Sequence, residues 1–186
     1  MTKPDYGSNS QSNRAKLREL ILHVADKCAG DEKFGAVKLN KILYFADFLS
    51  YRDRGRSITG VPYQRLEMGP APVPLLPVKA DLIESGDAEE LEMMYHGHKQ
   101  RRLIAKRRAR LDAMFSAEDI AIVDLVIDEL WPYNASEISE LSHGITWKVA
   151  KTQQRIPYQS VFVTNRAPTK DDLDWAAGIV EAERSA

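Results

Sequence analysis

The residues that could do chemistry are few in this sequence. His96 and His98 flank Gly97, and two histidines in one turn could bind a metal ion, although a metal site usually needs more than two ligands. No cysteine or carboxylate cluster has the spacing to complete such a site, so we expect an exposed turn and no metal. The single cysteine, Cys28, falls on the apolar face of a predicted helix, which favours a buried side chain over a nucleophile.

His143 lies at the end of another predicted helix, beside Gly144 and four residues before Trp147. The helix dipole favours a histidine there, and a general base would need an acid or a nucleophile that the sequence does not identify. The sequence also lacks a phosphate-binding loop of the usual kind, the G-x-S-x-G nucleophile motif and the H-E-x-x-H zinc motif. We therefore predict a protein that is not an enzyme, with no catalytic residue and no cofactor.

A basic segment, "KQRRLIAKRRAR", runs from residue 99 to 110 and carries seven Lys and Arg residues. Six acidic residues and no basic one lie between 81 and 92, and eight acidic residues and no Lys or Arg lie between 111 and 147. A nucleic-acid-binding domain would usually be net positive, whereas this chain has a net charge of -1. We expect a solvated hairpin face first, an interface with a protein partner second and nucleic acid third. The interface candidates are Arg101, Arg102, Lys106, Arg107 and Arg108.

Composition limits the class of protein. The chain has 186 residues, of which 44% are hydrophobic, so we expect one compact domain over residues 14–184 after a disordered polar tail at 1–13. No apolar run reaches the ~20 residues that span a bilayer, and one cysteine allows no disulfide within the chain. A soluble cytoplasmic protein is expected.

The elements that must position these residues are predicted to be mostly helical. Apolar residues recur at helical spacing from 15 to 28, and the segment 37–49 is apolar around most of its circumference. A helix of that kind should be central and buried, and Gly55 should end it. The polar residues that interrupt it are Lys38, Asn40, Lys41 and Asp47.

Alternation and capping residues predict the remaining elements. A β-hairpin is expected within residues 91–106 and a short strand within 63–68. Capping sequences predict helices that begin after Ser116, Asn134 and Thr169. The predicted fold class is α+β and mostly α: a helical domain around a buried central helix, with a small antiparallel hairpin or sheet.

The stretch "LEMGPAPVPLLP", residues 66–77, holds four prolines and allows three interpretations. A linker is disfavoured because Val73, Leu75 and Leu76 are packing residues. The sequence "PLLPVK" has the form of a ligand for a polyproline groove. The third interpretation, which we favour, is a stiff turn at Gly69-Pro70 followed by a helix toward Ser85, with prolines in its first turn.

Four ordered motifs between about residues 34 and 158 resemble the Panacea domain, the SocA-like, phage-associated antitoxin domain. The helix motif of that family matches Lys38, Leu39, Leu43, Tyr44, Phe45 and Ala46. Its Gly-Pro turn matches Gly69 and Pro70, with Met68 in place of the usual aromatic residue and Ala71 where valine is common. Its Leu-Ser-His element and following tryptophan match Leu141, Ser142, His143 and Trp147, and "IPYQSV" is the fourth motif.

The resemblance implies an antitoxin of a type II toxin–antitoxin system, which binds and neutralises a toxin encoded beside it and is not an enzyme. One branch of the family resembles an adaptor that delivers its toxin to the ClpXP protease, and this is the first alternative. Some members carry a DNA-binding domain, which the ~30 residues before the motif are too few to hold; nucleic-acid binding by the basic segment is the further alternative. The resemblance marks eight residues as partner-binding or as motif residues that define the fold: Lys38, Tyr44, Met68, Gly69, Pro70, Ser142, His143 and Trp147. One hypothesis is that the Gly69-Pro70 segment packs against residues 143–147 and shapes a toxin-facing groove. The alternative, which we favour, is that these residues define the fold.

Overall fold

The computed structural model describes residues 10–163, 169–171 and 174. Its longer helices are α1 (Gln11–Lys27), α2 (Ala36–Arg54), α3 (Leu75–Glu84) and α4 (Ala117–Leu130). The shorter ones are α5 (Ala135–Leu141), α6 (Ile145–Val149) and the 3-10 helices η1 (Cys28–Gly30) and η2 (Tyr158–Phe162). The strands are β1 (Tyr63–Leu66), β2 (Gly69–Pro72), β3 (Ala88–Tyr95), β4 (His98–Ala105) and β5 (Arg155–Ile156). The predicted class, α+β and mostly α, is confirmed.

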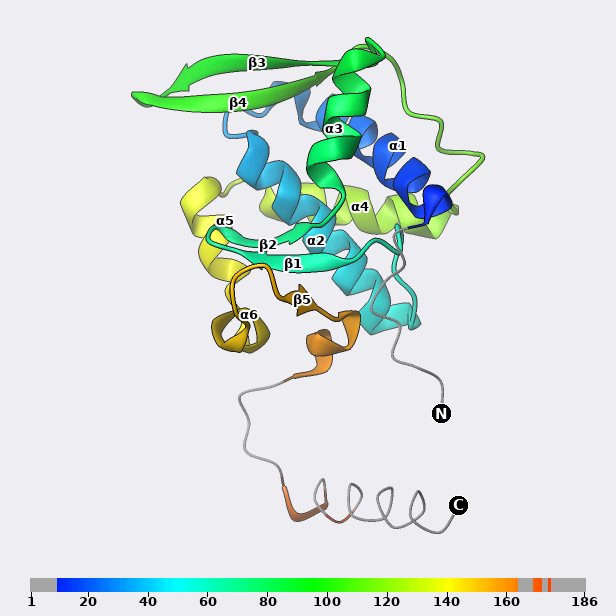
Figure 1. The fold of residues 1–186 in the computed structure, drawn as a ribbon, viewed down its shortest axis with the longest axis vertical. Coiled ribbons are helices and arrows are strands. Elements are labelled where there is room, and N and C mark those ends of the chain that lie inside the picture. The colour runs from blue at the N-terminus through cyan, green and yellow to red at the C-terminus, as the bar shows by residue number, and fades with distance from the viewer. Residues whose placement is uncertain (1–9, 164–168, 172–173, 175–186) are drawn as a thin grey trace.

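Helix α2 runs through the middle of the fold (Figure 1) and contacts α1, α4, α5, β2 and η2. Its apolar residues, among them Leu39, Ile42 and Leu43, are buried, so the prediction of a central helix is confirmed. Gly55 ends the helix in the left-handed conformation, as expected. The polar residues Lys38, Lys41 and Asp47, which interrupt the apolar pattern, are buried as well, and each has hydrogen-bond partners.

The first sheet has the strand order β2-β1-β5 and lies against one side of α2. The prediction that Gly69-Pro70 forms the turn was wrong. The turn is Glu67-Met68, and Gly69 to Pro72 pair with β1 as a strand. Pro70 and Pro72 are tolerated because β2 is an edge strand, where a missing N–H leaves no partner unbonded. The prolines that follow do lead into a helix, since α3 begins at Leu75.

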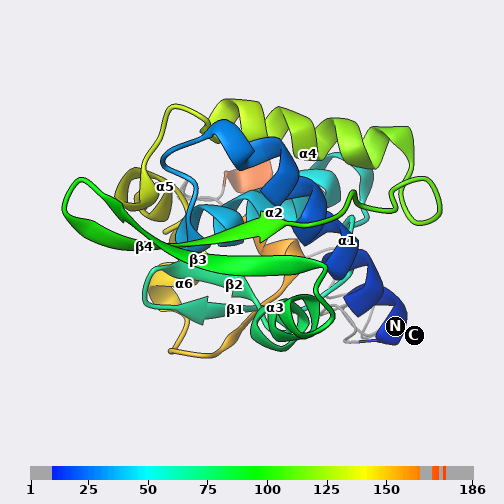
Figure 2. The ribbon, with the colours of Figure 1, turned by 90° about the horizontal axis from the view of Figure 1, so that it is seen from above.

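Strands β3 and β4 form a separate antiparallel hairpin, as predicted. His96 and Gly97 make its turn with φ of 47° and 81°, the pattern of a type I′ turn. In Figures 1 and 2 the hairpin extends past the helices, so its distal half overhangs the N-terminal end of α2.

Capping residues set several helix ends where the sequence predicted them. Ser116 with Asp119, and Asn134 with Glu137, form complete capping boxes for α4 and α5. Helix α1 begins earlier than expected, because Ser10 caps it; residues 11–13 belong to it and not to the tail. Residues 1–9, and most of the helix predicted after Thr169, lie outside the described residues.

Candidate functional site

The family-like motif residues meet where the β1–β2 turn lies against α5 and α6. Ser139 Oγ donates to the Met68 carbonyl over 2.7 Å, and Trp147 Nε1 donates to the Leu66 carbonyl over 2.9 Å. Arg65 Nε donates to the Trp147 carbonyl over 3.2 Å. Segments more than seventy residues apart in sequence are thereby joined through main-chain acceptors. We call these residues, with Lys41, Gly69, Pro70, Ser142 and His143, the motif cluster.

An aromatic and cationic stack forms the outer part of the motif cluster. The rings of His143 and Trp147 lie parallel with centroids 3.6 Å apart, and the guanidinium carbon of Arg65 lies 4.4 Å from the Trp147 ring centroid. A cation over the face of an indole is a favourable contact. The Leu66 carbonyl accepts from Trp147 and the Met68 carbonyl accepts from Ser139, so the β1–β2 hairpin lies against α5 and α6 next to the Gly69-Pro70 segment.

Gly69 is the closest point between the β1–β2 hairpin and the helices. Its φ of +101° suits glycine alone. A Cβ atom on Gly69 would overlap Ser142 Oγ and would lie 2.6 Å from Lys41 Nζ. The buried Ser142 hydroxyl donates to the Ser139 carbonyl, so it is held in place. The glycine of the motif is thus required by close approach as well as by backbone conformation.

Lys41 lies beneath the β1–β2 hairpin with 1% of its surface exposed. Its Nζ donates to the Pro70 carbonyl over 3.1 Å, and no carboxylate among the described residues forms an ion pair with it. Burial lowers the pKa of Lys41 to about 8. Burial also lowers the pKa of His143, and the charge of Lys41 lowers it further. Sequence reasoning missed Lys41 as a motif-cluster residue, and its only signal was a lysine inside an otherwise apolar helix.

The motif cluster resembles a serine–histidine pair but lacks the geometry for nucleophilic catalysis. Ser139 Oγ lies 3.5 Å from His143 Nε2, whereas its proton is directed to the Met68 carbonyl at 2.7 Å. No described carboxylate bonds to the His143 ring to orient it as a base. Within the described part of the chain, no group of three His, Cys, Asp or Glu residues could hold a metal ion. Cys28 is buried, which raises the pKa of its thiol to about 12.

Two of the marked motif residues lie elsewhere and have structural partners. Lys38 forms a buried ion pair with Asp31 at 2.6 Å and donates to the carbonyls of Trp131 and Tyr133, so it holds the end of α4. Tyr44 packs against the rings of Phe45, Phe48 and Tyr63. Burial raises the pKa of Tyr44 to about 12.

The five residues of the predicted charged interface differ in burial and in ion pairing. Arg102 is buried and donates to the carbonyls of Cys28, Ala29 and Asp31, so its assignment to an exposed face was wrong. Arg107 forms ion pairs with Glu19 and Asp87. These carboxylates raise the pKa of Arg107, and their effect exceeds the lowering of the pKa that burial causes. Lys106 pairs with Glu89 over 2.7 Å at the surface. Arg101 and Arg108 are exposed, and their side chains have no ion-pair partner among the described residues.

The β3–β4 hairpin is a second region where the sequence pattern does not match the burial of the side chains. Leu91, Met93 and Met94 are all exposed, although apolar residues in a strand are expected to face the core. The side chain of Met68 in the motif cluster and those of Leu141 and Val149, which neighbour the cluster in sequence, are exposed too. The toxin-facing groove that the sequence suggested beside Trp147 stays a prediction.

A family model described as the antitoxin SocA-like, Panacea domain matches residues 39–148. This match covers more than half of the chain and contains the whole motif cluster. The protein belongs to the SocA-like Panacea domain family. No curated protein and no solved structure matches the chain. None of the helices in the described residues is both long enough and apolar enough to span a membrane.

Proposed function

We propose that this Panacea domain is the antitoxin of a type II toxin–antitoxin system and neutralises its toxin by direct binding. The observation that supports it best is the family match over residues 39–148, since the family is named for an antitoxin. Neutralisation by binding covers the active surface of the toxin and requires no catalytic group in the antitoxin. The protein acts in the cytoplasm and not as an enzyme.

The contacts of the motif cluster agree with a binding protein. Ser139, Trp147 and Lys41 use their donors on main-chain carbonyls of the β1–β2 hairpin. Such bonds fix the shape of a surface and leave no activated nucleophile or base. We therefore assign the motif cluster to the support of the fold, and place the partner surface outside it.

Co-expression with the product of the adjacent gene tests this function. The neighbour is expressed alone under tight control and then together with this protein, while growth and co-purification are followed. Relief of toxicity with recovery of a stable complex is the expected result. Relief accompanied by ClpXP-dependent loss of the neighbour's protein would replace occlusion with the adaptor mechanism. A harmless neighbour that forms no complex would contradict the proposal.

A further inference from the structure

The strongest candidate for a binding surface outside the motif cluster is a groove beneath the overhanging β3–β4 hairpin. It encloses about 890 Å³ between the distal hairpin and the N-terminal ends of α2 and α5. Its lining includes Lys33, Tyr95, His98, Lys99, Arg101 and Asn134. A volume of this size exceeds what one side chain fills and lies within the range of ligand and peptide sites.

The charge of the groove is positive. Lys33, Lys99 and Arg101 line it, and Glu92 is the only carboxylate among its lining residues. Glu92 is already bound to Lys99 at 2.7 Å, whereas Arg101 is exposed and has no ion-pair partner in the described residues. The first turn of α2 also faces the groove at Gly35, Ala36 and Val37, and no side chain caps that helix. These features favour an anionic ligand.

The open edge of β4 faces the groove. Side chains alternate across a strand, so the lining by three consecutive residues, Lys99, Gln100 and Arg101, indicates that the strand presents its edge there. The type I′ turn makes Tyr95 and His98 a hydrogen-bonded pair, which leaves Lys99 and Arg101 at non-hydrogen-bonded positions. Their N–H and C=O groups therefore point away from β3, and no described residue binds them.

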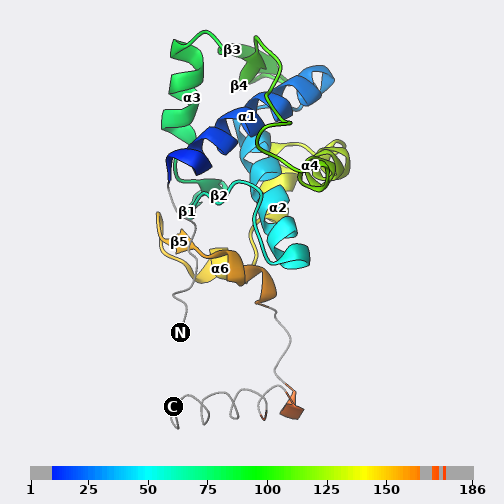
Figure 3. The ribbon, with the colours of Figure 1, turned by 90° about the vertical axis from the view of Figure 1, so that its right-hand side faces the viewer.

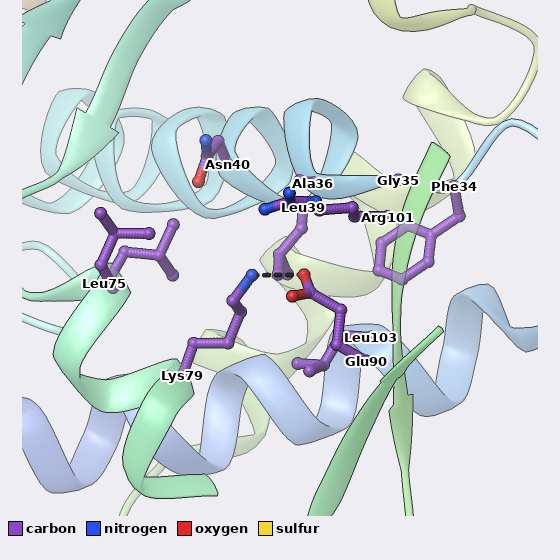
Figure 4. Close-up of a pocket in the computed structure, with 11 residues that line it drawn as sticks. Phe34, Gly35, Ala36, Leu39, Asn40, Leu75, Lys79, Glu90, Arg101 and Leu103 are labelled. Carbon is purple, nitrogen blue, oxygen red and sulfur yellow. Dashed lines mark hydrogen bonds and ion pairs between the residues drawn. The ribbon is translucent and has the colours of Figure 1, made fainter. Parts of the chain in front are cut away.

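The side chains of β4 hold this edge in a fixed position. Gln100 Nε2 donates to the Glu32 carbonyl over 3.2 Å, and Gln100 packs against Gly35. Arg102 is tied to η1 through the carbonyls of Cys28 and Ala29. Arg101 also lines a second, smaller cavity of about 60 Å³ between α2, α3 and the hairpin, whose lining includes the 2.5 Å ion pair between Lys79 and Glu90 (Figure 4). Contacts within the protein therefore hold the wall of the groove in place without a bound partner.

We propose that this groove binds an extended acidic segment of the toxin, which adds to β4 as a further strand. The open main-chain edge selects a polypeptide in extended conformation. Lys99 and Arg101, two residues apart, project on one face of β4, so they match Asp or Glu at alternate positions of the added strand. A nucleic acid would match the cations but would leave the main-chain edge unpaired. The inference rests on the proposed function and names the surface that performs it.

The test uses the full chain and the product of the adjacent gene. Lys99→Glu/Arg101→Glu reverses both cations of the β4 edge. Arg52→Glu/Arg56→Glu makes the same charge change on two exposed residues, one in the last turn of α2 and one just after that helix. We expect the groove variant to weaken the complex by about thirtyfold and to lose neutralisation, and the control to bind within about threefold of wild type. Thermal unfolding of each variant verifies that it is folded.

A second pair of variants separates charge from main-chain pairing. Arg101→Gln and Arg101→Pro both remove the cation, but only proline removes the outward N–H, and the ladder to β3 stays intact. Arg101→Pro should bind about fivefold more weakly than Arg101→Gln if a strand is added, because one main-chain hydrogen bond is lost. Equal binding by the two folded variants would overturn strand addition.

Other outcomes identify other occupants. If the wild type forms the complex and the groove variant binds equally well, the groove is not the interface, while the antitoxin function stands. Loss of binding in Met68→Glu/Val149→Glu alone would move the interface to the motif cluster. Groove-dependent binding of a fluorescent 12-mer RNA or DNA, or groove-dependent self-association, would make nucleic acid or a second copy the occupant. A wild type that neither binds nor neutralises the neighbour would overturn both proposals.

Discussion

The two antiparallel hairpins in the described part of the chain each have a two-residue turn, but their surroundings differ. The β1–β2 hairpin is covered by α2, α5 and α6, and buried or half-buried donors such as Lys41 and Ser139 bind its main-chain carbonyls. The β3–β4 hairpin is held by the bonds of Gln100 and Arg102 and by the Lys79–Glu90 ion pair, and its distal half lies over the groove. Figure 3 shows the β3–β4 hairpin at the top of the fold, above α1, with β1 and β2 below. The comparison shows that residues of a recognisable sequence motif can stabilise the fold, whereas a candidate binding surface can have no sequence motif.

The largest effect should come from the glycines of the two hairpins. Gly69→Ala should lower the free energy of unfolding by about 4 kcal/mol, because a Cβ at φ +101° would overlap Ser142 and Lys41. Gly97→Ala, at φ +81° in open space, should cost about 1 kcal/mol from backbone strain alone. Urea unfolding of both variants measures the difference. Equal losses would remove the distinction between a covered and an open hairpin.

Stability between pH 8 and 10.5 should report the buried charge under the β1–β2 hairpin. The pKa of Lys41 is lowered to about 8 when folded from 10.5, so in this window the unfolded chain binds more protons and stability rises with pH. The unfolding free energy of wild type minus that of Lys41→Met should therefore rise by about 3 kcal/mol across the window. Parallel denaturant titrations of the two proteins give this difference. A constant difference would show that folding does not lower the pKa of Lys41.

Neighbouring arginines of β4 offer the sharpest contrast within one hairpin. Arg102→Ala should lower the free energy of unfolding by about 3 kcal/mol, since it leaves three carbonyls without their buried donor. Arg101→Ala should cost less than about 0.5 kcal/mol, because that side chain is exposed and unpaired in the described structure. Thermal and urea unfolding compare the two. A large loss from Arg101→Ala would mean that the groove wall is part of the core.

A smaller effect than that of Gly69→Ala or Arg102→Ala should come from Trp147. Trp147→Phe should lower the free energy of unfolding, measured in urea, by about 1 kcal/mol. The substitution removes the hydrogen bond to the Leu66 carbonyl and keeps most of the ring stacking. Toxin neutralisation should persist if the motif cluster supports the fold. A Trp147→Ala variant that stays folded but fails to bind the toxin would instead support a partner-facing role for this cluster.

The sequence predicted much of the fold because its local signals agreed with one another. Helix α2 was recognised from its nearly continuous apolar surface, and α4 and α5 from their capping residues. The β1–β2 turn was misplaced by two residues because Gly-Pro is a strong turn signal, and only the pairing with β1 shows that these residues form an edge strand. Helix α6 and strand β5, of five and two residues, are too short to produce a periodic pattern.

The candidate site was only partly predictable. Among the residues that the family resemblance marked, Gly69 lies against Ser142 and His143 stacks on Trp147, and the chain belongs to that family. The contributions of Lys41, Arg65 and Ser139 needed the structure, because each binds a main-chain atom of a distant segment. Sequence patterns report side-chain types and do not show which carbonyls remain without a donor.

The sequence by itself determined the class of the protein, the central helix and the family, because periodicity, capping and ordered motifs are local properties of the chain. Only the tertiary structure decided which charges remain available. Arg101 and Arg102 are adjacent and chemically identical, yet one lines an open groove and the other is buried on η1. The reason is the alternation of a strand between two faces with different neighbours, which depends on how the hairpin is seated on the helices.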